Sequence, residues 1–172
     1  FAIFADVRER TLRPTVVTYN AAISAHQKVQ LWEKVILLLE DVRAVELLPD
    51  VISYNAAISA CEAAMSFPLT LGLLLDMRKA NLKPDVITYS TAISACERAE
   101  DWEHAMVLLG EMRRCNVDPD LICYNAALSA CEKGARWETA LHLAARMLRR
   151  GPFPDAFSLA GVAGACGRAR RW

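Results

Sequence analysis

The sequence contains little glycine, only 7 of its 172 residues, and it has no net charge, because 20 Lys and Arg balance 20 Asp and Glu. The low glycine content excludes a collagen-like or low-complexity chain, and a hydrophobic fraction of 54% predicts a packed core. Because the charges cancel, no overall basic field indicates a nucleic-acid partner. A nucleic-acid interface would therefore depend on where individual charges lie.

Long apolar runs are also missing. The longest uncharged apolar stretches, 69–75 and 156–166, are well short of the roughly 20 residues that a membrane-spanning helix needs, so we expect no membrane partner. No signal-peptide pattern occurs, and we expect the six cysteines to stay reduced. The chain begins at Phe1 and ends at Trp172 within the pattern described below, so we interpret it as an excerpt without its targeting segment.

Motifs for catalysis and cofactor binding are absent from the sequence. It has no glycine-rich phosphate loop, no nucleophile motif and no H-x-E deaminase signature, so we expect no enzymatic activity, no cofactor and no small-molecule substrate. Four cysteines recur at one spacing, but helices stacked about 8–10 Å apart hold such sulfurs too far apart for a disulfide or a zinc site. We interpret them as small buried residues and expect no metal. They are Cys61, Cys96, Cys131 and Cys166.

A repeat of 35 residues runs through the chain. Each period predicts two helices, roughly 17–28 and 32–44 in the first, because apolar residues recur at three- and four-residue spacing. A proline closes each period, and the Asp that usually follows suits the N-terminus of the next helix. Asp101 and Ser66 are expected to cap second helices. The residues in register are Pro14, Pro49, Pro84, Pro119 and Pro154, then Tyr19, Tyr54, Tyr89 and Tyr124, then Trp32, Phe67, Trp102, Trp137 and Trp172.

The repeat predicts an all-α fold, an α-solenoid of stacked helix-turn-helix hairpins. Complete repeats are expected at 16–50, 51–85, 86–120 and 121–155. They are flanked by the end of a truncated repeat at 1–15 and the start of another at 156–172.

The period of 35, the Tyr-Asn near the start of the repeat and the closing Pro-Asp resemble the pentatricopeptide repeat family, over essentially the whole chain. The resemblance implies a right-handed superhelix that binds single-stranded RNA at about one base per repeat. It also implies a role in organelle RNA processing, stability, editing or translation, in a mitochondrion or chloroplast, with other RNA-processing proteins as further candidate partners. The alternative is a tetratricopeptide-like scaffold for peptide binding or assembly.

In this family, the fifth and the last residue of a repeat read one base together. Asn with Asp is implied to favour U while tolerating C, and Ser with Asp to favour G, which gives a core of 5′-U-U-G-U-3′. An amide supplies a donor and an acceptor, and a hydroxyl a smaller version of both. The competing interpretation of each Asp is a helix cap. The pairs are Asn20 with Asp50, Asn55 with Asp85, Ser90 with Asp120, and Asn125 with Asp155.

Two further positions match family positions that contact RNA. The second residue of a repeat resembles the side chains that sandwich successive bases, with a first-turn core residue as the alternative; these are Val17, Ile52, Ile87, Ile122 and Phe157. The thirteenth residue is usually basic and is expected to contact phosphates, with a cation at a helix C-terminus as the alternative. The basic residues are Lys28, Arg98, Lys133 and Arg168.

Overall fold

The protein is a row of short helices of nearly equal length in the computed structural model, which describes residues 14–170. The helices in this range are α2 (Val16–Lys28), α3 (Trp32–Ala44), α4 (Val51–Ala63), α5 (Phe67–Lys79), α6 (Val86–Arg98), α7 (Trp102–Arg114), α8 (Leu121–Lys133), α9 (Trp137–Arg150) and α10 (Ala156–Arg168). No strand occurs among the described residues. The all-α solenoid predicted from the periodicity is therefore confirmed, whereas Trp172 and nearly all of the truncated repeat at 1–15 lie outside the described residues.

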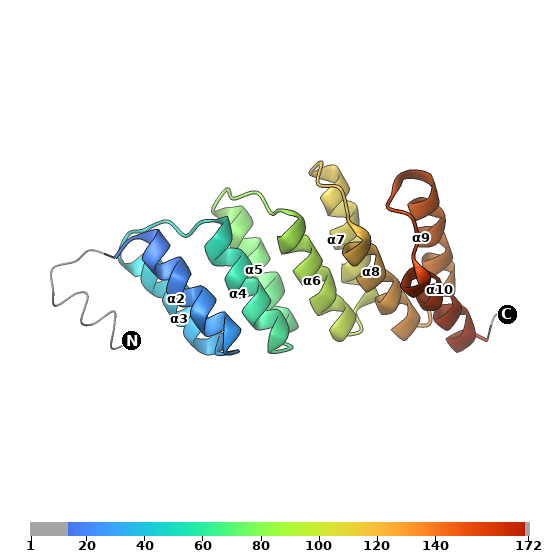
Figure 1. Ribbon diagram of the computed structural model, residues 1–172, viewed down its shortest axis with the longest axis horizontal. Coiled ribbons are helices and arrows are strands. Elements are labelled where there is room, and N and C mark those ends of the chain that lie inside the picture. The colour runs from blue at the N-terminus through green and yellow to red at the C-terminus, as the bar shows by residue number, and fades with distance from the viewer. Residues whose placement is uncertain (1–13, 171–172) are drawn as a thin grey trace.

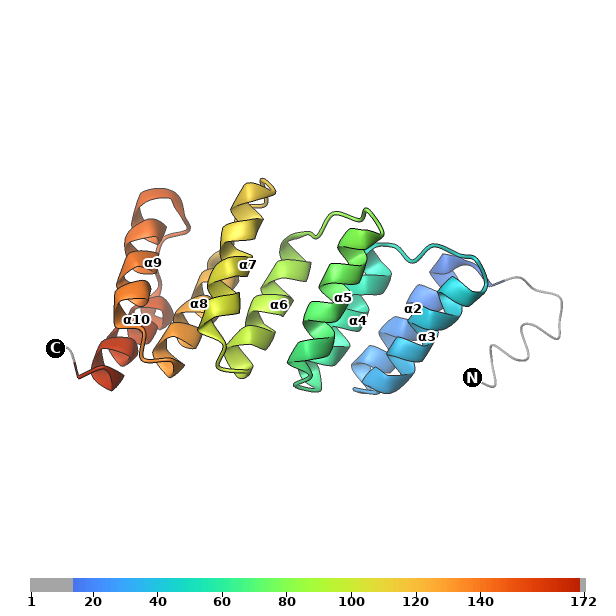
Figure 2. The same ribbon diagram turned by 180° about the vertical axis from the view of Figure 1, so that it is seen from behind.

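The helices form two layers, with α2 and α10 at opposite ends of the row (Figure 1). The first helices of successive hairpins, α2, α4, α6, α8 and α10, face the viewer in Figure 1, and each contacts the next. The second helices, α3, α5, α7 and α9, are nearer the viewer in Figure 2. This succession gives equivalent residues of the first helices equivalent places along one face of the solenoid.

The core repeats with the sequence. At equivalent places in α4, α6 and α8, a tyrosine, an alanine and a cysteine are at most 1% exposed. The tyrosine hydroxyls are not left unpaired, since Arg43 donates to Tyr54 at 2.6 Å and Arg113 donates to Tyr124. Small residues in the first helices let neighbouring helices approach closely, as ridge-into-groove packing requires.

Burial also fixes the state of the repeated cysteines. It raises the pKa of Cys61 to about 11 and that of Cys96 to about 12, so both are neutral thiols at physiological pH. Cys131 is equally buried, whereas Cys166 is partly exposed. The interpretation of these cysteines as small buried residues holds for the first three.

The turns inside the hairpins share one backbone conformation. Met65, Glu100 and Ala135 have φ of 54°, 57° and 53°, the left-handed region. This conformation lets the residue after each of them bond back to the helix, as when the Arg136 N–H donates to the Cys131 carbonyl at 2.8 Å. Asp101 caps α7 through the His104 N–H at 3.0 Å, as predicted, but Ser66 makes no side-chain cap for α5. No helix in 14–170 has both the length and the hydropathy that crossing a membrane requires.

Candidate nucleic-acid interface

Each aspartate that closes a repeat is the N-cap of the following first helix. The carboxylate of Asp50 accepts a hydrogen bond from the Ser53 N–H at 2.9 Å, and that of Asp85 accepts from the Thr88 N–H at 2.8 Å. Asp120 and Asp155 cap α8 and α10 in the same way. The capping interpretation is thus correct, and the next contacts show that it does not exclude a second role.

The same carboxylates also bind the asparagine of the preceding repeat. The Asn20 amide nitrogen donates to both oxygens of Asp50 at 3.1 Å. The Asn55 amide donates to the Asp85 oxygens at 3.2 and 3.1 Å, and the equivalent contacts from Asn125 are 3.4 Å. Each pair joins the first turns of two neighbouring first helices, so the fifth and last residues of a repeat share one surface.

The third repeat differs, because its fifth residue is a serine. The Ser90 hydroxyl donates to the Ile87 carbonyl of its own helix at 3.0 Å. No hydrogen bond joins Ser90 to Asp120, since a serine side chain is too short to span the distance that an asparagine spans. The predicted pair therefore occupies equivalent places without a direct contact.

Hydrogen bonds keep the paired aspartates ionised. Burial by itself would raise the pKa of Asp85, but it is outweighed by hydrogen bonds from the Thr88 N–H, the Thr88 hydroxyl and the Asn55 amide, so the pKa lies below its ordinary value. The pKa of Asp50 is lowered by the equivalent donors against the same opposing effect of burial. Each is therefore an acceptor at neutral pH.

A hollow of about 380 Å³ lies at the pair of the second repeat. Asn55 and Asp85 line it together with Ile52 and Ile87, and the rest of the lining is mainly polar: Ser24, Gln27, Ser59 and Thr91, with Val51 and Ala56. The site thus combines two exposed isoleucines with two amides, Asn55 and Gln27, and one carboxylate. Apolar walls with a few convergent polar groups are typical of a ligand-binding surface.

The second residue of each repeat does not belong to the core. Val17 is 76% exposed, and the four equivalent residues of later repeats are each 62% exposed. The alternative interpretation as first-turn core residues is therefore wrong. A regular row of exposed branched and aromatic side chains instead follows the first helices; its later members are Ile52, Ile87, Ile122 and Phe157.

Three of the four basic thirteenth residues make ion pairs that the sequence analysis did not predict. Arg98 Nε lies 3.0 Å from Glu62 Oε1, and Lys133 Nζ lies 2.6 Å from Glu97 Oε1. Arg168 is 3.7 Å from Glu132 in the same arrangement. A glutamate in the preceding first helix thus binds each of these cations, and any phosphate contact competes with it. The signal was visible in the sequence as a regular spacing of 36 residues between acid and base.

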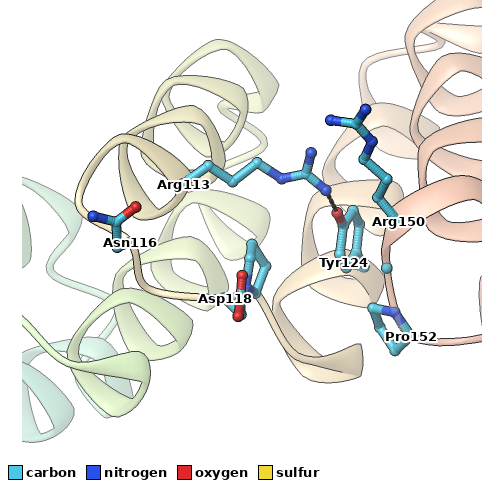
Figure 3. Close-up of a pocket in the computed structure, with 8 residues that line it drawn as sticks. Arg113, Asn116, Asp118, Tyr124, Arg150 and Pro152 are labelled. Atoms are coloured by element: carbon cyan, nitrogen blue, oxygen red, sulfur yellow. Dashed lines mark hydrogen bonds between the residues drawn. The ribbon is translucent and has the colours of Figure 1, made fainter.

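A larger hollow, about 490 Å³, is lined by none of the residues of the Asn–Asp pairs (Figure 3). Arg113 extends to the hydroxyl of Tyr124, which accepts a hydrogen bond from it, and Arg150 also lines the hollow. Asp118 is also in its wall, and the hollow shares no residue with the one at Asn55. No group of three His, Cys, Asp or Glu side chains suited to a metal ion occurs within 14–170.

The contacts missed by sequence reasoning include a third member of each asparagine pair. The hydroxyl of the third residue in the next repeat donates to the asparagine carbonyl at 2.5 Å; these are Ser53 to Asn20, Thr88 to Asn55 and Ser158 to Asn125. The third residue is Thr or Ser in the repeats that begin at 16, 51 and 86 but Cys123 in the fourth. This difference between the repeats was visible in the sequence and pointed to a hydroxyl at the third position.

Solved structures with the same fold include pentatricopeptide repeat proteins. The crystal structure of maize PPR10 covers 98% of this chain with a TM-score of 0.85 and 22% identity, while the chain spans 24% of PPR10. PPR10 in complex with an 18-nt psaJ RNA element matches at 26% identity and a TM-score of 0.76, with 97% and 25% covered. The PPR domain of Arabidopsis thaliana protein-only RNase P 1 in complex with tRNA matches at 16% identity and a TM-score of 0.79, with 87% of this chain and 79% of that chain covered.

The chain therefore spans about a quarter of the length of PPR10. A comparison with curated proteins finds no match. The family profile of the pentatricopeptide repeat domain matches residues 1–29 and 72–133, slightly more than half of the chain, and the PPR repeat profile matches 122–152. On these matches, and on the hairpin solenoid that carries them, this chain belongs to the pentatricopeptide repeat family.

Proposed function

We propose that this chain binds single-stranded RNA, with one base read by each of the repeats 16–50, 51–85, 86–120 and 121–155. The preferred core is 5′-U-U-G-U-3′, with C tolerated at the U positions. The observation that supports it is the hollow at the second repeat, where Asn55 and Asp85 lie with the exposed Ile52 and Ile87. A base between these walls would meet a polar edge that can distinguish it from other bases.

The pairing chemistry suits uracil. After donating to Asp85, the Asn55 amide keeps a second N–H and a carbonyl lone pair. Uracil offers a carbonyl acceptor next to the N3–H donor, so these groups match one to one. Ser90 has only a hydroxyl, and its smaller volume leaves room for a purine above Asp120.

The exposed row of second residues supplies the walls for the bases. Base stacking on aromatic side chains is worth about 1–3 kcal/mol per base in single-strand binders, and aliphatic walls give less. A base that is sandwiched between two side chains needs both of them at one hollow, and Ile52 and Ile87 line the same hollow. Val17, Ile122 and Phe157 are proposed to extend the row to either side.

The basic thirteenth residues are proposed to contact phosphates by exchanging a glutamate for RNA. Lys28 has no ion pair among the described residues, whereas Arg98 and Lys133 are held by Glu62 and Glu97. Because each exchange gives up an existing ion pair, these contacts contribute less than free cations would. Affinity therefore rests mainly on the bases, in a protein whose net charge is zero.

The wider role follows from the family. Among the similar structures, that of PPR10 holds an RNA element and that of the RNase P 1 PPR domain holds tRNA. We propose that the protein containing this chain serves organelle RNA processing, stability, editing or translation. In this role the repeats act by holding an RNA segment, without catalytic activity of their own, beside other RNA-processing proteins.

The test is a titration of the chain against fluorescently labelled RNA at fixed salt. An oligonucleotide with U-U-G-U is expected to bind more tightly than one of the same composition in scrambled order. Equal and negligible binding to both would refute the proposal and favour a peptide-binding scaffold. In the same assay, Ser90→Asn is expected to change the preference at the third base from G to U.

A further inference from the structure

The third residue of the following repeat lies against the asparagine of each base-reading pair. Its hydroxyl is 2.5 Å from the asparagine carbonyl oxygen in all three asparagine repeats. Ser53 and Thr88 are 0% exposed and Ser158 is 1% exposed, so water does not compete for these hydrogen bonds. These three residues are called the anchoring hydroxyls below.

The direction of each bond follows from the neighbouring groups. The Thr88 hydroxyl oxygen is 2.5 Å from the Asn55 carbonyl oxygen and 2.8 Å from a carboxylate oxygen of Asp85, so its single proton is shared between these two acceptors. If the amide were reversed, its carbonyl would point at the carboxylate, and two acceptors would face each other. The carboxylate thus selects the orientation of the amide, and the hydroxyl holds its other end.

The fourth repeat supplies an internal contrast. Its third residue is Cys123, and the preceding reading residue is Ser90, which bonds to its own helix instead. Cys123 still gives its backbone N–H to Asp120 at 2.9 Å, so this half of the helix cap does not need a hydroxyl, although Thr88 also accepts a hydrogen bond from the Asp85 N–H at 3.2 Å. In the repeats that begin at 51, 86, 121 and 156, a hydroxyl therefore follows each asparagine, and a thiol follows the serine.

We propose that Ser53, Thr88 and Ser158 are positioning residues that fix the asparagine amides in one orientation and thereby sharpen the choice of U over C. The proposal rests on the proposed function. Uracil and cytosine differ in the order of donor and acceptor along one edge, so an amide held at both ends in this orientation matches uracil better than cytosine. An amide held at one end can turn and accept cytosine.

The first test is Thr88→Val, which keeps the branched shape and removes the hydroxyl. The hydrogen bond from the Thr88 N–H to the Asp85 carboxylate stays, whereas the reciprocal one from the Asp85 N–H to Thr88 Oγ1, at 3.2 Å, is lost and stability falls with it. The C-to-U ratio is the dissociation constant of RNA with C at the second base divided by that of RNA with U there. In Thr88→Val this ratio is expected to fall about threefold, the equivalent of one modest hydrogen bond. Thr88→Ser is expected to restore the ratio.

The matched control is Thr70→Val. Thr70 is also a fully buried threonine whose hydroxyl bonds to a backbone carbonyl, that of Ser66, but it lies in the second helix α5. Its loss is expected to lower stability without changing the C-to-U ratio. A purely structural role of Thr88 would make the two variants alike.

A gain-of-function test uses the serine repeat. Ser90→Asn alone is expected to prefer U at the third base, and Ser90→Asn with Cys123→Ser is expected to have a C-to-U ratio about threefold higher. If the unaltered chain has no U preference at the second base, the proposed function itself fails. If that preference exists but Thr88→Val leaves the ratio unchanged, only the anchoring role is refuted.

Discussion

Asp85 is the residue whose two roles are best separated by substitution. Its carboxylate caps α6 through the Thr88 N–H at 2.8 Å and accepts the Asn55 amide at 3.1 and 3.2 Å. Asp85→Ala removes both interactions. Asp101→Ala removes a cap of the same kind, 3.0 Å from the His104 N–H, from a helix of the other layer. The pair of variants therefore distinguishes helix capping from base reading.

The magnitudes follow from the contacts. Loss of an N-cap lowers the free energy of unfolding by about 0.5–2 kcal/mol, which both variants share. Asp85→Ala also loses the hydrogen bond from Asn55, about 0.5–1.5 kcal/mol more. Because the amide then has no fixed orientation, the dissociation constant for U-U-G-U RNA is expected to rise about tenfold, or about 1.4 kcal/mol. Asp101→Ala should leave it unchanged.

Urea unfolding measures the stabilities, and fluorescence anisotropy with RNA carrying U or A at the second base measures binding and preference. Asp85→Ala should lose most of the discrimination between the two oligonucleotides. The reasoning is refuted if Asp85→Ala discriminates as the unaltered chain does, or if Asp101→Ala loses discrimination equally. In either case the aspartate of the pair would act as a helix cap alone.

Three further predictions concern stability. Leu109→Ala, at a fully buried position, should lower the free energy of unfolding by about 2–5 kcal/mol in urea titrations, while Leu141→Ala, at a position 45% exposed, should cost much less. Ala135→Gly should raise the free energy of unfolding by about 0.5–1 kcal/mol, because Ala135 has φ of 53°, a left-handed conformation that strains any residue with a Cβ. A lower free energy of unfolding in this variant would contradict the prediction. Because the pKa of Asp85 is lower in the folded state, the unfolded state binds its proton more readily. The free energy of unfolding should therefore fall as pH decreases below 3.8. This fall should be smaller in Asp85→Ala, which lacks the carboxylate.

The periodicity alone was sufficient to predict the solenoid. A spacing of 35 shared by proline, tyrosine and tryptophan positions allows only a stack of equivalent units, and the apolar pattern within each unit requires two helices. Helix ends were also predictable, since Asp50 and Asp101 are good caps wherever a helix begins after them. The helical pattern and the helix caps depend on residues that are close together in the chain, so the sequence is enough to predict them.

The contacts between repeats depended on the tertiary structure. The sequence indicated that Asn55 and Asp85 share a role, but only the stacking of α4 on α6 brings the amide, the carboxylate and the Thr88 hydroxyl within hydrogen-bond distance. The same stacking pairs Arg98 with Glu62, which weakens its expected role at phosphates. Residues 30 to 36 apart meet because of how one hairpin rotates onto the next, and that rotation is fixed by the packing of the whole core, not by any local pattern.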